Sequence, residues 1–143
     1  MFTKEESTII RQEFWTSFGK SFPRKWLLYN TKIKNFAFKF VADRKQALVC
    51  LDIDMKNNEL RGHYWDKMLS LKNILKTQYI NLIIYDNEYL LENGKSIYRI
   101  YIQFPDKFSI HNKKTWYACY QFFIKQMTQF ELFFEEYEDF IKN

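Results

Sequence analysis

The chain has 143 residues and a formal net charge of +5 at pH 7, and this length is typical of a single domain, here residues 1–143. Hydrophobic residues make up 47% of the chain and aromatic residues 20%, with three glycines and two prolines, which excludes extended disorder and low-complexity linkers. Cys50 and Cys119 are too few for a disulfide framework, and no apolar run approaches the roughly 18 residues of a membrane span, so we expect a cytoplasmic protein without a membrane partner.

The first predicted element is a helix over about residues 4–20. Thr3 and Glu6 match a capping box, in which two side chains satisfy free backbone N–H groups at a helix start. Apolar residues then recur every four positions, as on the buried face of a helix. They are Ile10, Phe14 and Phe18. Gly19 and Pro23 indicate that the helix ends near residue 20.

Three strands are predicted in the segment that follows. Residues 25–30 form a short apolar and aromatic run, which favours a strand. Residues 36–42 alternate phenylalanine with other residues, and residues 47–54 are rich in Val and Leu, so both are expected to be strands. The polar link at residues 43–46 predicts that the last two strands form a hairpin.

A second helix is predicted over about residues 57–78, because apolar residues there return to helical spacing. Strand-like segments at residues 81–91 and 96–104 then flank Asn93-Gly94, a dipeptide that favours a two-residue type I′ hairpin turn. We expect a second hairpin here, with a bend near Asp86-Asn87.

The last predicted element is one long helix over residues 113–142, with Asn112 as its N-cap. One face carries mainly aromatic side chains at alternating spacings of four and three residues, the 3.5-residue period of packed helices. This aromatic stripe consists of Trp116, Tyr120, Phe123, Met127, Phe130, Phe134, Tyr137 and Ile141. The helix spans about 45 Å, more than the roughly 37 Å diameter expected for the chain. Either it bends or lies diagonally across its own sheet, or the stripe forms a homodimer interface.

Together these elements predict an α+β fold of order αβββαββα, with three helices and a mainly antiparallel sheet of four to five strands. The order is compatible with a reduced restriction-endonuclease-like fold. Asp54 and Lys56 resemble the (D/E)-x-K half of the metal site of such nucleases, and Asp52 shares their strand end. In that chemistry two carboxylates hold Mg²⁺ and the lysine assists the attacking water.

The expected strand register argues against an active nuclease site. With a turn at residues 43–46, Asp54 lies opposite Asn35, which carries no charge, whereas Asp43 is about 26 Å away along the strand. The second acid that the metal needs is therefore missing. Polar residues at a strand end explain Asp52, Asp54 and Lys56 better, so an enzyme is the less favoured interpretation, and Mg²⁺ is expected only under the nuclease alternative.

Other motifs for catalysis or cofactor binding are missing from the sequence. It contains no glycine-rich phosphate loop, no GxSxG and no HExxH pattern. His63 and His111 lie far apart without a ligand pattern around them. We therefore expect neither a resident metal nor a nucleotide cofactor.

Basic and aromatic residues alternate between residues 11 and 45. The rings of the strand at 36–42 point to one side and are explained as core. Five cations around the predicted turns, with no acid between Glu13 and Asp43, form a candidate phosphate-binding surface, which we call the basic turn cluster. It consists of Lys20, Arg24, Lys25, Lys32 and Lys34. The competing partner for these cations is the acidic end of the last helix, with five acids in residues 127–143, in this subunit or in a dimer mate.

Four segments resemble a bacterial family of small domains of unknown function that is common in Bacteroidetes. They are residues 11–20 (Arg-Gln-Glu-Phe-Trp-Thr-Ser-Phe-Gly-Lys), 25–32 (Lys-Trp-Leu-Leu-Tyr-Asn-Thr-Lys), 38–45 (Phe-Lys-Phe-Val-Ala-Asp-Arg-Lys) and 137–142 (Tyr-Glu-Asp-Phe-Ile-Lys). The resemblance covers nearly the whole chain. Similar domains in other bacteria are joined to nuclease-like domains, which implies an association with nucleic-acid processing but supplies no catalytic residues.

The sequence thus predicts a non-catalytic module that associates with DNA or RNA through the basic turn cluster. Two alternatives remain open. One is a homodimeric protein-interaction module that uses the aromatic stripe, and the other is an active or degenerate metal-dependent nuclease that uses Asp52, Asp54 and Lys56.

Overall fold

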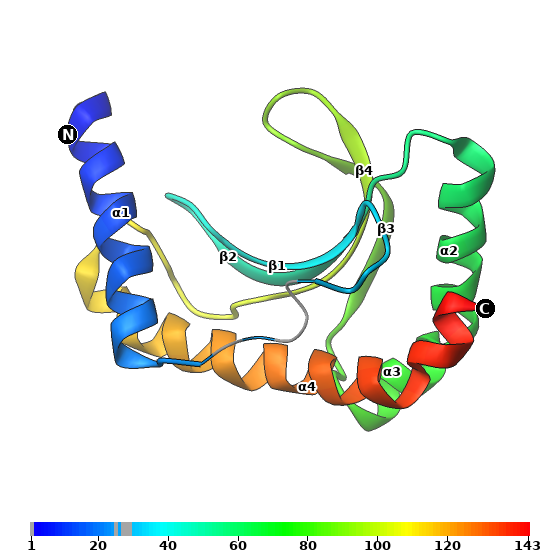
Figure 1. The fold of residues 1–143 in the computed structure, drawn as a ribbon. Coiled ribbons are helices and arrows are strands. Elements are labelled where there is room, and N and C mark those ends of the chain that lie inside the picture. The colour runs from blue at the N-terminus through cyan, green and yellow to red at the C-terminus, as the bar shows by residue number, and fades with distance from the viewer. Residues whose placement is uncertain (1, 25, 27–29) are drawn as a thin grey trace.

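The structure is a computed structural model in which residues 2–24, 26 and 30–143 are described (Figure 1). Along these residues the elements are α1 (Lys4–Ser21), β1 (Phe36–Ala42), β2 (Ala47–Ile53), α2 (Asn58–Ser70), α3 (Lys72–Gln78), β3 (Ile84–Leu90), β4 (Ser96–Gln103), the short 3₁₀ helix η2 (Lys113–Thr115) and α4 (Trp116–Lys142). The four strands form one antiparallel sheet in the order β1-β2-β4-β3. The predicted α+β class with an antiparallel sheet is confirmed.

The strand predicted over residues 25–30 falls mainly on residues 25 and 27–29, which lie outside the described residues. Its two described members, Trp26 and Asn30, are not in a strand. At the start of the chain, the predicted capping box of α1 is present: the Thr3 hydroxyl accepts from the Glu6 N–H, and the Glu6 carboxylate accepts from the Thr3 N–H.

The first hairpin has the register expected from its sequence. Phe36 pairs with Ile53 and Ala42 with Ala47, and the Asp54 N–H donates to the Asn35 carbonyl oxygen at 2.9 Å. The Asp43 carboxylate closes the turn by accepting from the N–H groups of the residues two and three positions later. This side chain therefore belongs to the turn, as the prediction assumed.

The second hairpin differs from the prediction in its turn. The Gly94 N–H donates to the Leu91 carbonyl oxygen, and Gly94 is the turn residue with positive φ, at 86°. A type I′ turn requires positive φ at Asn93 as well, so this is a longer loop closed by glycine. The register shifts between Asp86 and Tyr89, where the bend was predicted.

Two helix boundaries also differ from the prediction. The expected helix over residues 57–78 is divided into α2 and α3 at Leu71, whose ψ of 0° ends the first helix. Leu71 is buried in the core, so the change of direction is anchored by packing. Asn112 caps as predicted by accepting from the Lys114 N–H, but the turn it begins is η2, and the α-helix starts at Trp116.

The sheet is curved, and its two faces have different surroundings (Figure 1). α4 runs beneath the convex face, while α1 and α2 stand at opposite ends of the sheet. Phenylalanines of β1 meet those of α4 on the convex face: the ring centroids of Phe38 and Phe130 are 5.1 Å apart, and those of Phe40 and Phe123 are 4.8 Å apart. This layer between the sheet and α4 is the main hydrophobic core.

The aromatic stripe of α4 packs within the chain itself. Seven of its eight residues are buried and Tyr137 is half-buried. The Tyr120 hydroxyl also donates to the Phe14 carbonyl oxygen of α1 at 2.7 Å. The far end of α4 reaches α2, where the Lys67 ammonium donates to the Phe140 carbonyl oxygen. The stripe is therefore covered by its own sheet and helices, and its assignment to a dimer interface is wrong.

Candidate functional site

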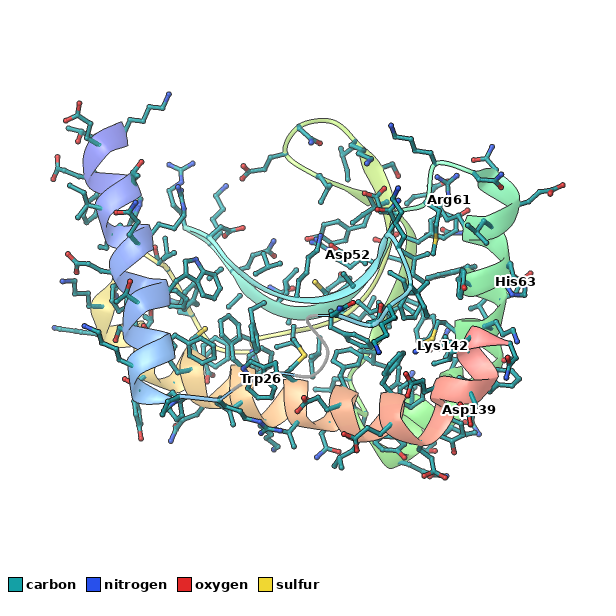
Figure 2. The ribbon with its side chains drawn as sticks, in the orientation of Figure 1. Trp26, Asp52, Arg61, His63, Asp139 and Lys142 are labelled. Atoms are coloured by element: carbon teal, nitrogen blue, oxygen red, sulfur yellow. The ribbon has the colours of Figure 1, made fainter. Side chains whose placement is uncertain are left out.

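The concave face of the sheet carries a buried row of charged side chains. Asp52 of β2 and Arg99 of β4 are direct cross-strand partners, and Arg99 donates to the carboxylate through Nε at 2.7 Å and Nη2 at 2.9 Å. Their side chains are only 4% and 6% exposed. The Lys39 ammonium of β1 lies 3.4 Å from the same carboxylate. Figure 2 shows Asp52 on the side of the sheet opposite α4.

The row continues into two aromatic side chains, Tyr89 of the outer strand β3 and Tyr101 of β4. The Arg99 guanidinium lies 4.4 Å from the ring centroid of Tyr89, and the Tyr89 and Tyr101 rings meet edge to face at 5.4 Å. The Gln46 amide donates to the Tyr89 hydroxyl at 3.4 Å. Burial lowers the pKa of Arg99, but the hydrogen bonds to Asp52 together with the nearby charges and a hydrogen bond to Tyr89 outweigh it, so its pKa lies above the ordinary value. Arg99 is therefore a fixed cation in a well-ordered row.

The thiols are not poised as nucleophiles. Cys50 lies in the same concave row, where burial and then the charge of Asp52 raise the pKa of its thiol far above its ordinary value. Burial alone raises the pKa of Cys119 to about 12. Both groups are thus protonated and inaccessible at neutral pH.

The geometry does not assemble the nuclease set Asp52, Asp54 and Lys56. Asp52 is held by Arg99, and Asp54 pairs with the Lys95 ammonium of the second hairpin at 2.9 Å, so each carboxylate has a cation as its partner. Lys56 is exposed. Among the described residues, no group of three or more His, Cys, Asp or Glu side chains could hold a metal ion. The carboxylate pair that Mg²⁺ chemistry needs is replaced by ion pairs.

The structure divides the basic turn cluster among separate places. Arg24 lies along α4, where it donates to the Thr128 hydroxyl at 3.0 Å and to the Glu131 carboxylate at 2.5 Å, with its guanidinium 4.1 Å from the Trp26 ring. This is the internal pairing with the last helix that the sequence offered as the competing interpretation. Arg24 is therefore engaged inside the fold.

The other described members of the cluster do not all line the same hollow. Lys20 lines a shallow hollow at the end of α1, together with Lys113 and Trp116. Lys32 and Lys34 line a different hollow just before β1. Lys25 lies outside the described residues.

A second basic surface lies above the concave face and was not predicted. A hollow of about 1140 Å³ is bounded by α1, the β1–β2 turn and the β3–β4 hairpin. We call it the basic groove. The residues that line it include Lys4, Arg11, Arg44, Lys45, Tyr89 and Arg99.

The rim cations of the groove, Lys4, Arg11, Arg44 and Lys45, are exposed. Within the part of the chain that the structure describes, none of their side chains forms an ion pair. The acids that line the groove are Asp43, which holds the β1–β2 turn, and Glu92 at the hairpin. The groove is therefore cationic, with free charges at its rim and a paired charge on its floor.

Sequence patterns contain a partial signal for this groove. Lys4 and Arg11 are seven residues apart, which places them on one face of a helix after two turns. Arg44 and Lys45 lie at the tip of a predicted hairpin. The pattern does not reveal that α1 stands beside that tip, because this follows from the packing of α1 on the start of α4.

Comparison with known proteins places the chain in a family. The family described as "Domain of unknown function (DUF4268)" matches residues 10–138, so the chain belongs to this family. No curated protein and no solved structure matches the chain. Membership in an unknown-function domain family was predicted and is confirmed, while bacterial origin and fusion to nuclease-like domains stay predictions. Among the described helices, none has the length and apolar character to cross a bilayer.

Proposed function

We propose that this DUF4268 domain is a non-catalytic module that binds nucleic acid through the basic groove. One observation carries the proposal: exposed cations from α1 and from the β1–β2 turn border one hollow without ion-pair partners among the described residues. A cation already paired with a carboxylate gains little from a phosphate. An unpaired, exposed cation releases counterions from the nucleic acid on binding, which favours association.

The floor of the groove supports a binding role over a catalytic one. Asp52 and Arg99 satisfy each other, and Cys50 beside them is a protonated thiol. Groups that satisfy one another in this way hold a surface in shape. The groove therefore offers a fixed shape and a positive potential.

The test measures binding of fluorescein-labelled 20-nucleotide DNA and RNA, single- and double-stranded, by fluorescence anisotropy at several salt concentrations. The groove variant carries Arg11→Gln, Arg44→Gln and Lys45→Gln. The matched control carries Lys20→Gln, Lys32→Gln and Lys34→Gln in the basic turn cluster, and it loses the same formal charge. Each lost phosphate contact lowers the slope of log K against log salt by about 0.7 to 0.9.

We expect the groove variant to lose at least 10-fold in affinity at about 50 mM salt and to show a slope about 2 units smaller, and the control to change much less. Absence of binding by the unaltered protein at that salt concentration would overturn the proposal. A larger loss in the control would move the contact surface to the basic turn cluster. The paired comparison therefore separates a local site from an effect of net charge.

A further inference from the structure

We infer that the basic groove accepts single-stranded nucleic acid, with phosphates at the rim and one unpaired base stacked on Tyr89. The inference rests on the proposed function and names its ligand class. It depends on the aromatic ring on the floor of the groove, whereas the proposed function depends on the exposed cations at its rim.

The groove is lined by an aromatic ring that contacts within the protein hold in place before any ligand arrives. Tyr89 is half-buried and lines the groove. Arg99 lies against its ring at 4.4 Å, Tyr101 meets it edge to face, and Gln46 contacts its hydroxyl. Arg99 is in turn fixed by two hydrogen bonds to Asp52. Because these contacts order the ring in the free protein, little side-chain entropy remains to be lost when a base stacks on it.

The placement of charge and ring suits a single strand. In a duplex the base faces are stacked inside the helix, and proteins reach base edges with an element that enters a groove of the DNA. Here the cations border a hollow, and the half-buried ring lies on its floor. A single strand can place its backbone on the rim and turn one base inward, the arrangement by which single-strand-binding proteins combine electrostatic and stacking contacts.

The chief alternative occupant is an acidic protein segment. Such a segment would use the rim cations in the same way, but its carboxylates would gain nothing from stacking on Tyr89. The tyrosine ring and the bases of the ligand therefore distinguish the two, and the experiment changes each of them in turn.

The experiment compares Tyr89→Leu, which removes the ring, with Tyr89→Phe, which keeps the ring and removes the hydroxyl. Ligands are a labelled 12-nucleotide single strand, the same strand annealed to its complement, and a single strand with abasic central positions. We expect Tyr89→Leu to weaken single-strand binding by about 5- to 100-fold, the range for loss of one stacked base, without changing the salt slope. Tyr89→Phe should stay within about threefold of the unaltered protein, and duplex should bind more weakly than single strand.

The abasic strand keeps the test independent of whether Tyr89→Leu folds well. It retains every phosphate but lacks the stacked base, so the unaltered protein should bind it about 5- to 100-fold more weakly than the normal strand. Equal affinity for abasic and normal strands would overturn the inference, as would equal affinity for single strand and duplex. An oligoglutamate peptide that competes as well as the single strand would also overturn it.

These outcomes separate the two proposals. Suppose that the groove variant weakens binding of single strand and duplex equally, that Tyr89→Leu leaves the affinity unchanged, and that the abasic strand binds as tightly as the normal one. The proposed function then stands and the single-strand inference fails. If the groove variant binds single strand and duplex as tightly as the unaltered protein does, the proposed function itself fails.

Discussion

The two faces of the sheet are both buried along β2, but they are buried by different chemistry. On the convex face, Val49, Leu51 and Ile53 pack in the hydrophobic core beneath which α4 runs. On the concave face, Asp52 is covered by Arg99 and Lys39 from its two neighbouring strands. The convex face is stabilised by shape and apolar area, whereas the concave face depends on a specific partner for each charge. The same degree of burial therefore predicts different responses to substitution.

The largest expected effect is on the convex face. Phe130 of α4 is fully buried against Phe38 of β1. Phe130→Ala should lower the free energy of unfolding by about 3 to 5 kcal/mol, because it removes a buried ring and leaves a cavity. Urea unfolding followed by circular dichroism measures this, and Phe130→Leu, which fills most of the space, should lose much less. A loss below about 1 kcal/mol for Phe130→Ala would show that α4 is not the main cover of this face.

On the concave face, the expected effect depends on whether one partner or both are removed. Asp52→Ala should cost about 3 kcal/mol, the lower end for breaking a buried pair, because water in the groove can reach part of the uncompensated Arg99. Asp52→Leu combined with Arg99→Met should recover most of that loss, since no buried charge is left alone. Urea unfolding followed by circular dichroism measures the stability of the single and the double variant. Equal losses in the single and double variants would contradict the view that pairing stabilises this face.

Cys119, which lies in the hydrophobic core, extends the comparison to pH. Burial raises the pKa of Cys119 from 9.0 to about 12, so the folded chain holds this proton where the unfolded chain releases it. Stability is therefore full below pH 9 and falls as the pH rises toward 12, by about 1 kcal/mol at pH 10 from this group. Cys119→Ala should show a smaller loss between pH 8 and pH 10 than the unaltered protein. Identical pH dependence in the two proteins would remove Cys119 as a cause.

The sequence was most informative where one local rule decided the structure. The capping box at Thr3 and the Asp54–Asn35 register follow from residues close in sequence or from a short hairpin, and both are present. The aromatic stripe shows the limit of such rules. Its 3.5-residue period establishes that one face of α4 is buried, but a period carries no information on which surface covers that face, so a dimer interface and an internal core look alike.

The candidate site was hidden for a related reason. The basic turn cluster was predicted because its residues are neighbours in sequence. In the structure Arg24 pairs with Glu131, and the other described members line two different hollows. The basic groove joins α1, the β1–β2 turn and the second hairpin, which are far apart in sequence. Only the packing of α1 beside the sheet brings these segments together. A cluster of charges that comes from distant segments leaves no contiguous pattern in the sequence, so it could not be predicted from the sequence.

The smallest expected effect on stability concerns the exposed cations at the rim of the basic groove. It tests whether these cations serve binding while the floor of the groove stabilises the fold. Arg11→Gln, Arg44→Gln and Lys45→Gln together should change the free energy of unfolding by no more than about 0.5 kcal/mol, because these exposed side chains form no ion pair among the described residues. Urea unfolding at the salt concentration of the binding assay measures this on the protein used there. A loss above about 2 kcal/mol would mean that the rim cations stabilise the fold, and a loss of affinity could not then be assigned to contacts with phosphate. An unchanged stability beside a weakened affinity would separate the rim from the Asp52–Arg99 pair, because loss of one partner of that pair is expected to destabilise the fold.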